Sequence, residues 1–158
     1  MPDPMPELLH HEDFPVGQVT TFGRYEVTRE EVLRFAAAYD PQPFHLDDEA
    51  AANSLFGRLA ASGWHTCAMA MRMMCDGYLL RSASLGSPGL EDIRWKQPVY
   101  PGDVLHMRMT VLESRPMRSR PGVGLMRARW EVLNQDGALC AEFAGWGMFR
   151  RRTGADAA

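Results

Sequence analysis

Trp64-His-Thr-Cys-Ala-Met-Ala-Met-Arg-Met-Met-Cys-Asp-Gly-Tyr-Leu-Leu-Arg81 is the stretch of sequence that decides the fold of this chain. Its apolar residues recur at the spacing of one helix face, and most residues between them are apolar as well. The positions on that face are Trp64, Cys67, Ala68, Met71, Cys75, Tyr78 and Leu79. A helix that is apolar on nearly every side needs covering by the rest of the protein, so the stretch predicts a long and largely buried helix.

On the C-terminal side of this helix the sequence changes to alternating apolar and polar residues. Residues 85–89, rich in glycine, predict the turn that ends the helix, and the alternation that follows is typical of β-strands. The four predicted strands begin near Ile93, Leu105, Met126 and Leu139. Residues 134–137, Asn-Gln-Asp-Gly, are a hairpin turn signal between the last two strands.

On the N-terminal side the sequence predicts a strand followed by short helices. Residues 18–27 contain the β-branched and aromatic residues of a first strand. Thr28 and Glu31 form a capping box that starts a helix ending at Asp40, and Asp47 can cap a further short helix. The order of elements predicts an α+β fold in which a curved antiparallel sheet wraps around the long helix.

The bulk composition is that of one soluble globular domain. At 158 residues, with 46% hydrophobic and 23% charged residues, the chain can bury a stable core without disulfide bonds or bound metal ions. We expect a single domain over residues 1–158, with a loose arm at 1–13 and a polar tail at 150–158. Seventeen basic residues stand against 20 acidic ones, which disfavours a nucleic-acid partner.

The sequence also predicts a protein of a reducing compartment. The N-terminal residues lack the basic and apolar regions of a signal peptide, and no apolar run is long enough for a membrane span, so we expect a cytoplasmic protein without a membrane partner. Cys67, Cys75 and Cys140 form no CxxC pair and are odd in number, so they are interpreted as small buried hydrophobic residues.

The segment Asp40-Pro-Gln-Pro-Phe-His45 concentrates titratable groups where no regular structure can form. Its two prolines remove backbone donors and favour extended geometry, so the segment should be stiff. A stiff loop can hold the Asp40 carboxylate and the His45 imidazole toward one point, as acid–base catalysis requires. The alternative is an Asx turn beside a hydrogen-bonded surface histidine.

The turn Ala60-Ala-Ser-Gly63 leads into the long helix. The N–H groups at a helix N-terminus are unpaired, and glycine lets a substrate approach the backbone closely, so Gly63 can bind a developing negative charge. The alternative, that Gly63 is only the first residue of a helix and binds nothing, is equally consistent with the turn. Ser62 is expected to cap the helix rather than touch substrate, and His65 to be structural or pocket-lining.

No motif for a metal or a nucleotide cofactor is present in the sequence. The five histidines lack HExxH or comparable ligand spacing, and neither a GxGxxG nor a P-loop pattern occurs, so we expect no metal and no cofactor. A GxSxG nucleophile elbow is also missing.

Three segments together resemble the MaoC-like hydratase/dehydratase family of (R)-specific enoyl-CoA hydratases. They are Asp40-Pro-Gln-Pro-Phe-His45-Leu-Asp47, Ala60-Ala-Ser-Gly63, and Arg94-Trp-Lys-Gln-Pro98-Val-Tyr-Pro101-Gly102-Asp103, in the family's order and at suitable separations. The resemblance extends from about Phe14 to Phe149. It implies a hotdog fold, a homodimer, an acyl-CoA thioester substrate, and addition of water to a 2-enoyl thioester or its removal.

The resemblance also implies roles for individual residues. Asp40 and His45 would form the acid–base dyad, and the backbone N–H of Gly63 would bind the thioester oxygen. Gln42 occupies the position at which the family's hydratases usually carry asparagine, a residue that helps to hold the acidic loop.

Two other functions remain open at this stage. One is a hotdog thioesterase, which would direct water at the thioester carbonyl. The other is a non-catalytic acyl-thioester binding module, for which Gln42 is the supporting feature. Arg115, Arg118 and Arg120 suit either a solvated hairpin tip or contacts with coenzyme A phosphates, and the methionines of residues 69–74 suit either core packing or an acyl pocket.

Overall fold

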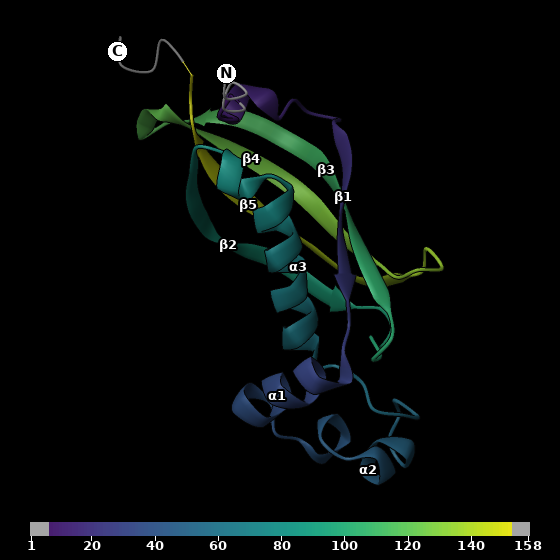
Figure 1. Cartoon of the computed structure of the whole chain (residues 1–158). Helices are drawn as coiled ribbons and strands as arrows, with labels where there is room; N and C mark the ends of the chain where they lie inside the picture. Colours follow the sequence, from purple (N-terminus) through teal and green to yellow (C-terminus); the bar gives the residue numbers. More distant parts are fainter. Residues whose placement is uncertain (1–6, 153–158) are drawn as a thin grey trace, which may run out of the picture.

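The central helix is α3 (Gly63–Gly77), which lies against the concave face of a single antiparallel sheet (Figure 1). This computed structural model describes residues 7–152. The other helical elements are η1 (His11–Asp13), α1 (Arg29–Tyr39), η2 (Pro43–His45), α2 (Asp48–Ala52) and η3 (Leu79–Arg81). The strands are β1 (Val19–Glu26), β2 (Ser84–Trp95), β3 (Val104–Met117), β4 (Arg120–Leu133) and β5 (Leu139–Arg150). The predicted α+β layout is confirmed.

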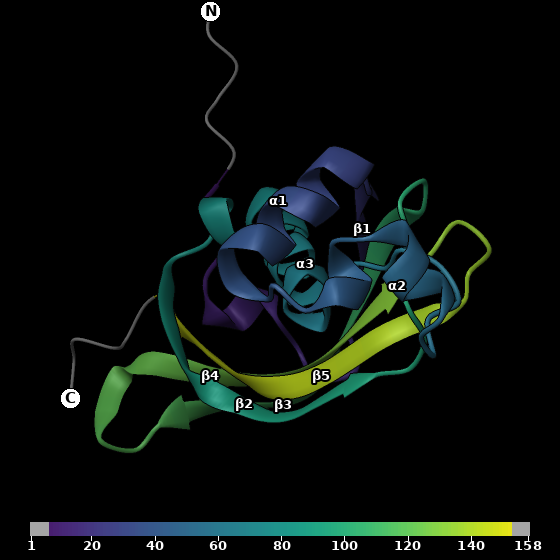
Figure 2. The same cartoon turned by 90° about the horizontal axis from the view of Figure 1, so that it is seen from below.

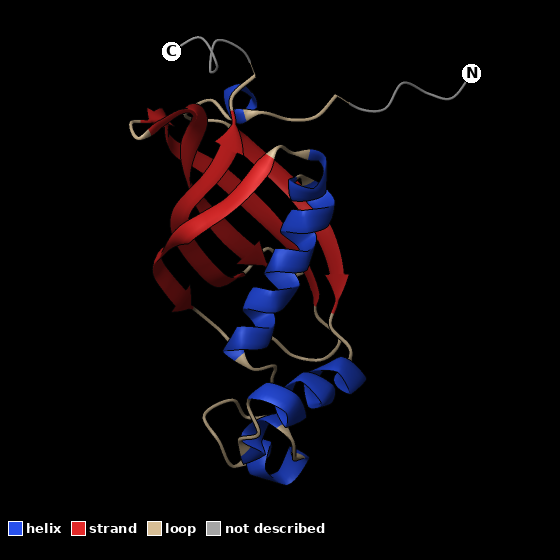
Figure 3. Cartoon of the chain, turned by 90° about the vertical axis from the view of Figure 1, so that its left-hand side faces the viewer, coloured by secondary structure: helices blue, strands red, loops and turns tan. Residues whose placement is uncertain are grey.

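The sheet has the strand order β1-β3-β4-β5-β2, and every neighbouring pair is antiparallel. It curves beneath α3, as the view along the helix shows (Figure 2). The strands β3, β4 and β5 are joined by hairpins in sequence order, whereas β1 and β2 form the two edges. Helices α1 and α2 lie beyond the N-terminal end of α3 (Figure 3).

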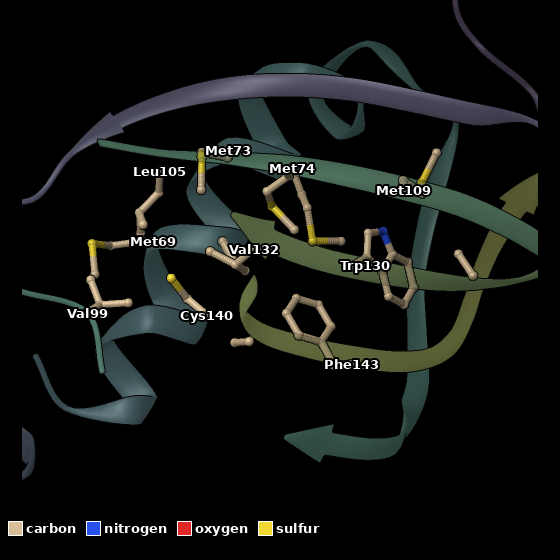
Figure 4. Close-up of a cluster of buried hydrophobic side chains, with 14 of the residues drawn as sticks. Met69, Met73, Met74, Val99, Leu105, Met109, Trp130, Val132, Cys140 and Phe143 are labelled. Atoms are coloured by element: carbon tan, nitrogen blue, oxygen red, sulfur yellow. The ribbon is translucent and has the colours of Figure 1, made fainter. Parts of the chain in front are cut away.

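The core fills the space between α3 and the sheet (Figure 4). The helix contributes Met69, Met73 and Met74, all buried, and these pack against residues of β3, β4 and β5 such as Leu105, Trp130 and Phe143. The alternation seen in the sequence therefore separates this inner face of the sheet from an outer face rich in ion pairs.

Two predictions about the long helix need correction. The helix ends at Gly77 and not near Arg81, because Tyr78 leaves helical geometry at φ −155° and a 3-10 turn follows. The helix is also not covered all round, since Trp64 is 58% and Met71 49% exposed.

The glycine-rich segment predicted as a turn belongs to the edge strand β2. Gly86 and Gly89 have positive φ values of 98° and 144°, and the pairing with β5 shifts register around both. The glycines therefore bend the strand at bulges instead of ending it.

The N-terminal segment is packed where it is described, contrary to the loose arm predicted for residues 1–13. Leu9 forms a β-bridge with Ser82, and His11 is buried against the β3–β4 hairpin. Arg152 at the other end of the described chain pairs with Asp13 at 2.8 Å. Residues 1–6 of the arm and 153–158 of the tail lie outside the described residues, so the prediction for them stays a prediction.

Within residues 7–152, none of the helices combines the length and the apolar composition that crossing a membrane requires.

Candidate active site

The acidic loop between α1 and α2 lies at the N-terminal end of α3. Asp40 is the C-cap of α1, and its backbone N–H still donates to Ala36 O. Pro41 cannot continue the helix, and Pro43 starts the short turn η2 that ends at His45. The loop thus turns back on itself, and both predicted dyad residues face one side.

Asp40 and His45 are brought together, as predicted. Asp40 Oδ2 lies 3.4 Å from His45 Nε2, and the two side chains are 16% and 4% exposed. His45 Nδ1 lies 2.8 Å from the carbonyl oxygen of Ala60. A carbonyl oxygen only accepts, so Nδ1 carries a hydrogen, and Nε2 is the ring nitrogen that faces Asp40.

The Asp40 carboxylate also receives two short hydrogen bonds. Gln42 Nε2 donates to Oδ1 and Ser62 Oγ donates to Oδ2, each at 2.7 Å. Burial raises the pKa of Asp40, but these two donors and the nearby His45 outweigh burial and hold that pKa below its ordinary value of 3.8. The carboxylate is therefore ionised at neutral pH and is oriented by both donors.

Ser62 differs from its predicted role. It is the N-cap residue of α3, yet its side chain makes no capping hydrogen bond and donates to Asp40 instead. It is fully buried. A serine directly before the first residue of a helix usually caps that helix. The hydrogen bond from Ser62 to Asp40 is therefore not predictable from the sequence pattern.

Gln42 reaches Asp40. Its exposed side-chain amide donates to Asp40 Oδ1, two residues away in the sequence. The acidic loop is thus held by the amide of Gln42, the role that the resemblance implies for this position.

Gly63 is the first residue of α3, which leaves its N–H without an acceptor inside the helix. Above it lies Trp95, the last residue of β2. A Cβ built on Gly63 would come within 2.6 Å of the Trp95 ring, and the indole Nε1 donates to Gly63 O at 2.9 Å. Only glycine fits beneath this ring.

Two cavities lie beside α3. The first, of about 360 Å³, contains the predicted site and is lined by residues that include Asp40, His45, Gly63, Trp64, Trp95 and Val99. The second, also of about 360 Å³, is nearly all apolar and lies between α3 and the sheet, with Cys67, Met71, Met74, Leu90, Trp130 and Phe143 among its lining residues. Met71 and Met74 therefore line a cavity, while Met69 and Met73 pack into the core.

His65 is structural, as expected. It is 1% exposed, stacks on Phe35 with ring centroids 4.6 Å apart, and its Nε2 lies 3.1 Å from Glu31 Oε1. Tyr25 also donates to this carboxylate, so the side chains link β1, α1 and α3.

The remaining candidates do not join the site. Arg115, Arg118 and Arg120 lie at the β3–β4 hairpin, and none of them lines either cavity. All three cysteines are free thiols, and only Cys140 is fully buried. Over the described residues, no three His, Cys, Asp or Glu side chains gather as a metal site would require.

Comparison with known proteins gives consistent matches. Residues 13–131 match the family model of the MaoC like domain. The crystal structure of a MaoC-like dehydratase from Rhodospirillum rubrum superposes with a TM-score of 0.85 at 41% identity, covering 92% of this chain and 99% of that one. The predicted hotdog fold is thereby confirmed.

Two curated relatives are each 29% identical to this chain. The uncharacterized protein YdeM of Bacillus subtilis matches over 71% of this chain and 79% of its own length. The 3-hydroxybutyryl-CoA dehydratase of Methylorubrum extorquens matches over 73% of each chain.

Proposed function

The chain belongs to the MaoC-like dehydratase domain family, and on that premise we propose that it hydrates 2-enoyl thioesters, or dehydrates the corresponding 3-hydroxyacyl thioesters. The observation that carries the proposal is that Asp40 Oδ2 and His45 Nε2 lie 3.4 Å apart inside one cavity. Hydration needs a base that takes a proton from water and an acid that delivers one to the α carbon, and these two side chains can provide both.

In the proposed hydration, a single water molecule donates one hydrogen bond to Asp40 Oδ2 and a second hydrogen bond to His45 Nε2. Its oxygen then attacks the β carbon, and one of the two acceptors takes a proton from it. The same pair returns a proton to the α carbon, so one H and one OH are added to the double bond. Dehydration is the same path in reverse.

The N-terminal end of α3 provides the third requirement. As water adds, negative charge develops on the thioester oxygen, and a preorganised donor stabilises it. We assign this donor to the N–H of Gly63, which lines the same cavity as the dyad and lies at the positive end of the helix dipole.

The apolar cavity beside α3 suits the acyl chain. Its lining is almost devoid of polar groups, and the flexible methionines Met71 and Met74 can adapt to a hydrocarbon. Coenzyme A is the proposed carrier, because the named activity of the Methylorubrum extorquens relative is that of a 3-hydroxybutyryl-CoA dehydratase.

We further propose a homodimer. Strand β2 is an open sheet edge along which Leu85 and Leu90 are 38% and 50% exposed, and Met71 on α3 is also exposed. An unpaired apolar edge is usually covered, and pairing with the same strand of a second copy covers it. Light scattering coupled to gel filtration measures the mass; a monomer at micromolar concentration would contradict the proposal.

The reaction is tested by following the loss of enoyl absorbance with trans-2-enoyl-CoA substrates, in wild type and in Asp40→Asn and His45→Ala. Removing an acid–base group should lower kcat/KM by about 100-fold or more. Asp136→Asn and His106→Ala are the matched controls, because neither residue lines the cavity that holds the dyad. Thermal unfolding of each variant checks that it folds.

Thiol release and ligand binding, measured beside this assay, separate the two other functions. Release of free thiol without loss of the double bond would indicate a thioesterase. Binding of enoyl-CoA without turnover in the wild type would indicate a binding module. Retention of wild-type rates by both dyad variants would disprove the assigned roles of Asp40 and His45.

A further inference from the structure

The Trp95 side chain stands at the boundary between the two cavities. The cavity that holds Asp40 and His45 has Trp95 and Gly63 in its lining, and the apolar cavity begins at Cys67, one helix turn after Gly63. Over the described residues, the two linings have no residue in common. The indole covers Gly63 so closely that a Cβ there would lie 2.6 Å from the ring.

Trp95 packs on the first turn of α3. Its Nε1 donates to Gly63 O at 2.9 Å, and its ring meets the edge of Trp64 with centroids 5.5 Å apart. Beneath the indole, Gly63 begins α3, and Cys67 follows one helix turn later. The indole therefore lines the catalytic cavity and lies one helix turn from the first residue of the apolar one.

The ring is only partly buried. Trp95 is 46% exposed and is the last residue of β2, paired with Ala141 before the chain leaves the sheet. One hydrogen bond holds the indole N–H, and Gly63 beneath offers no side chain to lock the ring. Trp95 is not one of the buried core residues that fill the space behind α3.

We propose that Trp95 determines acyl-chain length by closing the passage between the two cavities. A short acyl group fits the catalytic cavity with the indole in place, whereas a longer one displaces the indole and extends into the apolar cavity beside Cys67 and Leu90. The inference rests on the proposed function, since it assumes an acyl thioester at the dyad.

The test compares trans-2-butenoyl-, trans-2-octenoyl- and trans-2-dodecenoyl-CoA with wild type, Trp95→Phe and Trp95→Ala. For Trp95→Ala we expect the ratio of kcat/KM for dodecenoyl over butenoyl to rise about tenfold or more, a size typical of a changed apolar pocket. Trp95→Phe should fall between. Leu55→Ala, at a fully exposed position, is the control and should leave the ratio unchanged.

A second measurement makes the inference independent of turnover. Butanoyl- and dodecanoyl-CoA cannot be hydrated, and their affinities are measured by titration calorimetry. In Trp95→Ala, the preference for dodecanoyl-CoA over butanoyl-CoA should rise about tenfold if Trp95 closes the passage. This result would support the role of Trp95 even if the wild type hydrates no enoyl-CoA. In that case only the proposed reaction would be wrong.

Equal effects on short and long substrates would contradict the role of Trp95 in chain length. If wild type is active and a folded Trp95→Ala variant changes kcat/KM for butenoyl- and dodecenoyl-CoA by the same factor, the proposed reaction is supported and the role of Trp95 is wrong. If Trp95→Ala changes the affinities for butanoyl- and dodecanoyl-CoA by the same factor, the role of Trp95 is also wrong, and this test needs no enzymatic activity.

Discussion

At the residue scale, the charge of the Asp40 carboxylate is decided by three neighbours. Gln42 and Ser62 each donate to one of its oxygens, and His45 lies beside Oδ2. Together they overcome the effect of burial and lower the pKa of Asp40 below 3.8. A carboxylate held by donors on both oxygens keeps one orientation, which fixes where it meets a bound water.

Replacing Ser62 by alanine removes one of these donors, so the pKa of Asp40 should rise. One hydrogen bond to a charged group contributes about 1.5 kcal/mol, which corresponds to about one pKa unit. Since Asp40 must be ionised to accept from water, the acid limb of kcat/KM should move to higher pH by about that unit. The measurement is a pH–rate profile of Ser62→Ala beside wild type.

Ser82→Ala is the control for this prediction. The Ser82 hydroxyl is likewise bound inside the protein, donating to Tyr78 O at 2.6 Å, but it lies outside both cavities. An acid limb that moves equally in both variants, or in neither, would show that the hydroxyl of Ser62 does not set the charge of Asp40.

At the element scale, α1 is held against α3 and β1 through one carboxylate. Glu31 of α1 accepts hydrogen bonds from Tyr25 of β1 and from His65 of α3. Burial and this hydrogen bond raise the pKa of Tyr25 to about 12. Because Asp40 is the C-cap of α1, the contact also sets where the dyad lies relative to Gly63 at the start of α3.

Glu31→Gln should lower the free energy of unfolding by about 1 kcal/mol at neutral pH, since a charged acceptor is lost from a partly exposed site. Burial raises the pKa of Glu31, but the two donors outweigh burial and hold it below 4.5. The stabilisation is therefore complete above pH 4.5 and is lost as the pH falls through the lower, folded-state pKa.

Urea denaturation at neutral pH and again below pH 4 measures both parts of this prediction, and the difference between Glu31→Gln and wild type should shrink in acid. Glu30→Gln removes a neighbouring carboxylate that is 88% exposed and should have little effect at either pH. A difference that persists in acid would assign the loss to packing instead of charge.

How far the sequence predicts the elements depends on whether local pattern or tertiary contact decides them. The N-cap at Thr28 and the alternation in β3–β5 are local, and α1 and these strands form as predicted. The capping box itself stays half formed, because the Glu31 side chain bonds Tyr25 and His65. The end of α3 and the path of residues 85–89 are not local. Gly86 and Gly89 look like a turn in isolation, but hydrogen bonds with β5 hold them in an edge strand.

At the scale of the whole molecule, η1 closes one end of the sheet. His11 Nε2 lies 2.8 Å from Ser114 Oγ and 3.2 Å from Leu125 O, and the ring packs directly on the backbone of Gly124. This contact is not predictable from the sequence, because His11 lies in a polar run beside Glu12 and Asp13 that is typical of a solvated arm.

Gly124→Ala should destabilise the protein by about 1–3 kcal/mol, because the added Cβ would lie 1.9 Å from His11 Cγ. In His11→Ala the obstructing ring is gone, so adding Gly124→Ala should then cost little. A double-mutant cycle by chemical denaturation measures this coupling. Additive effects of the two substitutions would mean that η1 does not pack on β4 in solution.

The pairing of Arg152 with Asp13 brings the two ends of the described chain to one side of the molecule, while the dyad lies at the opposite end, near α1 and α2 (Figure 1). We therefore expect a resin, a fluorophore or a fused enzyme attached beyond Glu7 or Arg152 to leave the cavity lined by Asp40 and His45 facing away from the anchor. Under the proposed function, a tethered form should take up and release thioesters as the free one does.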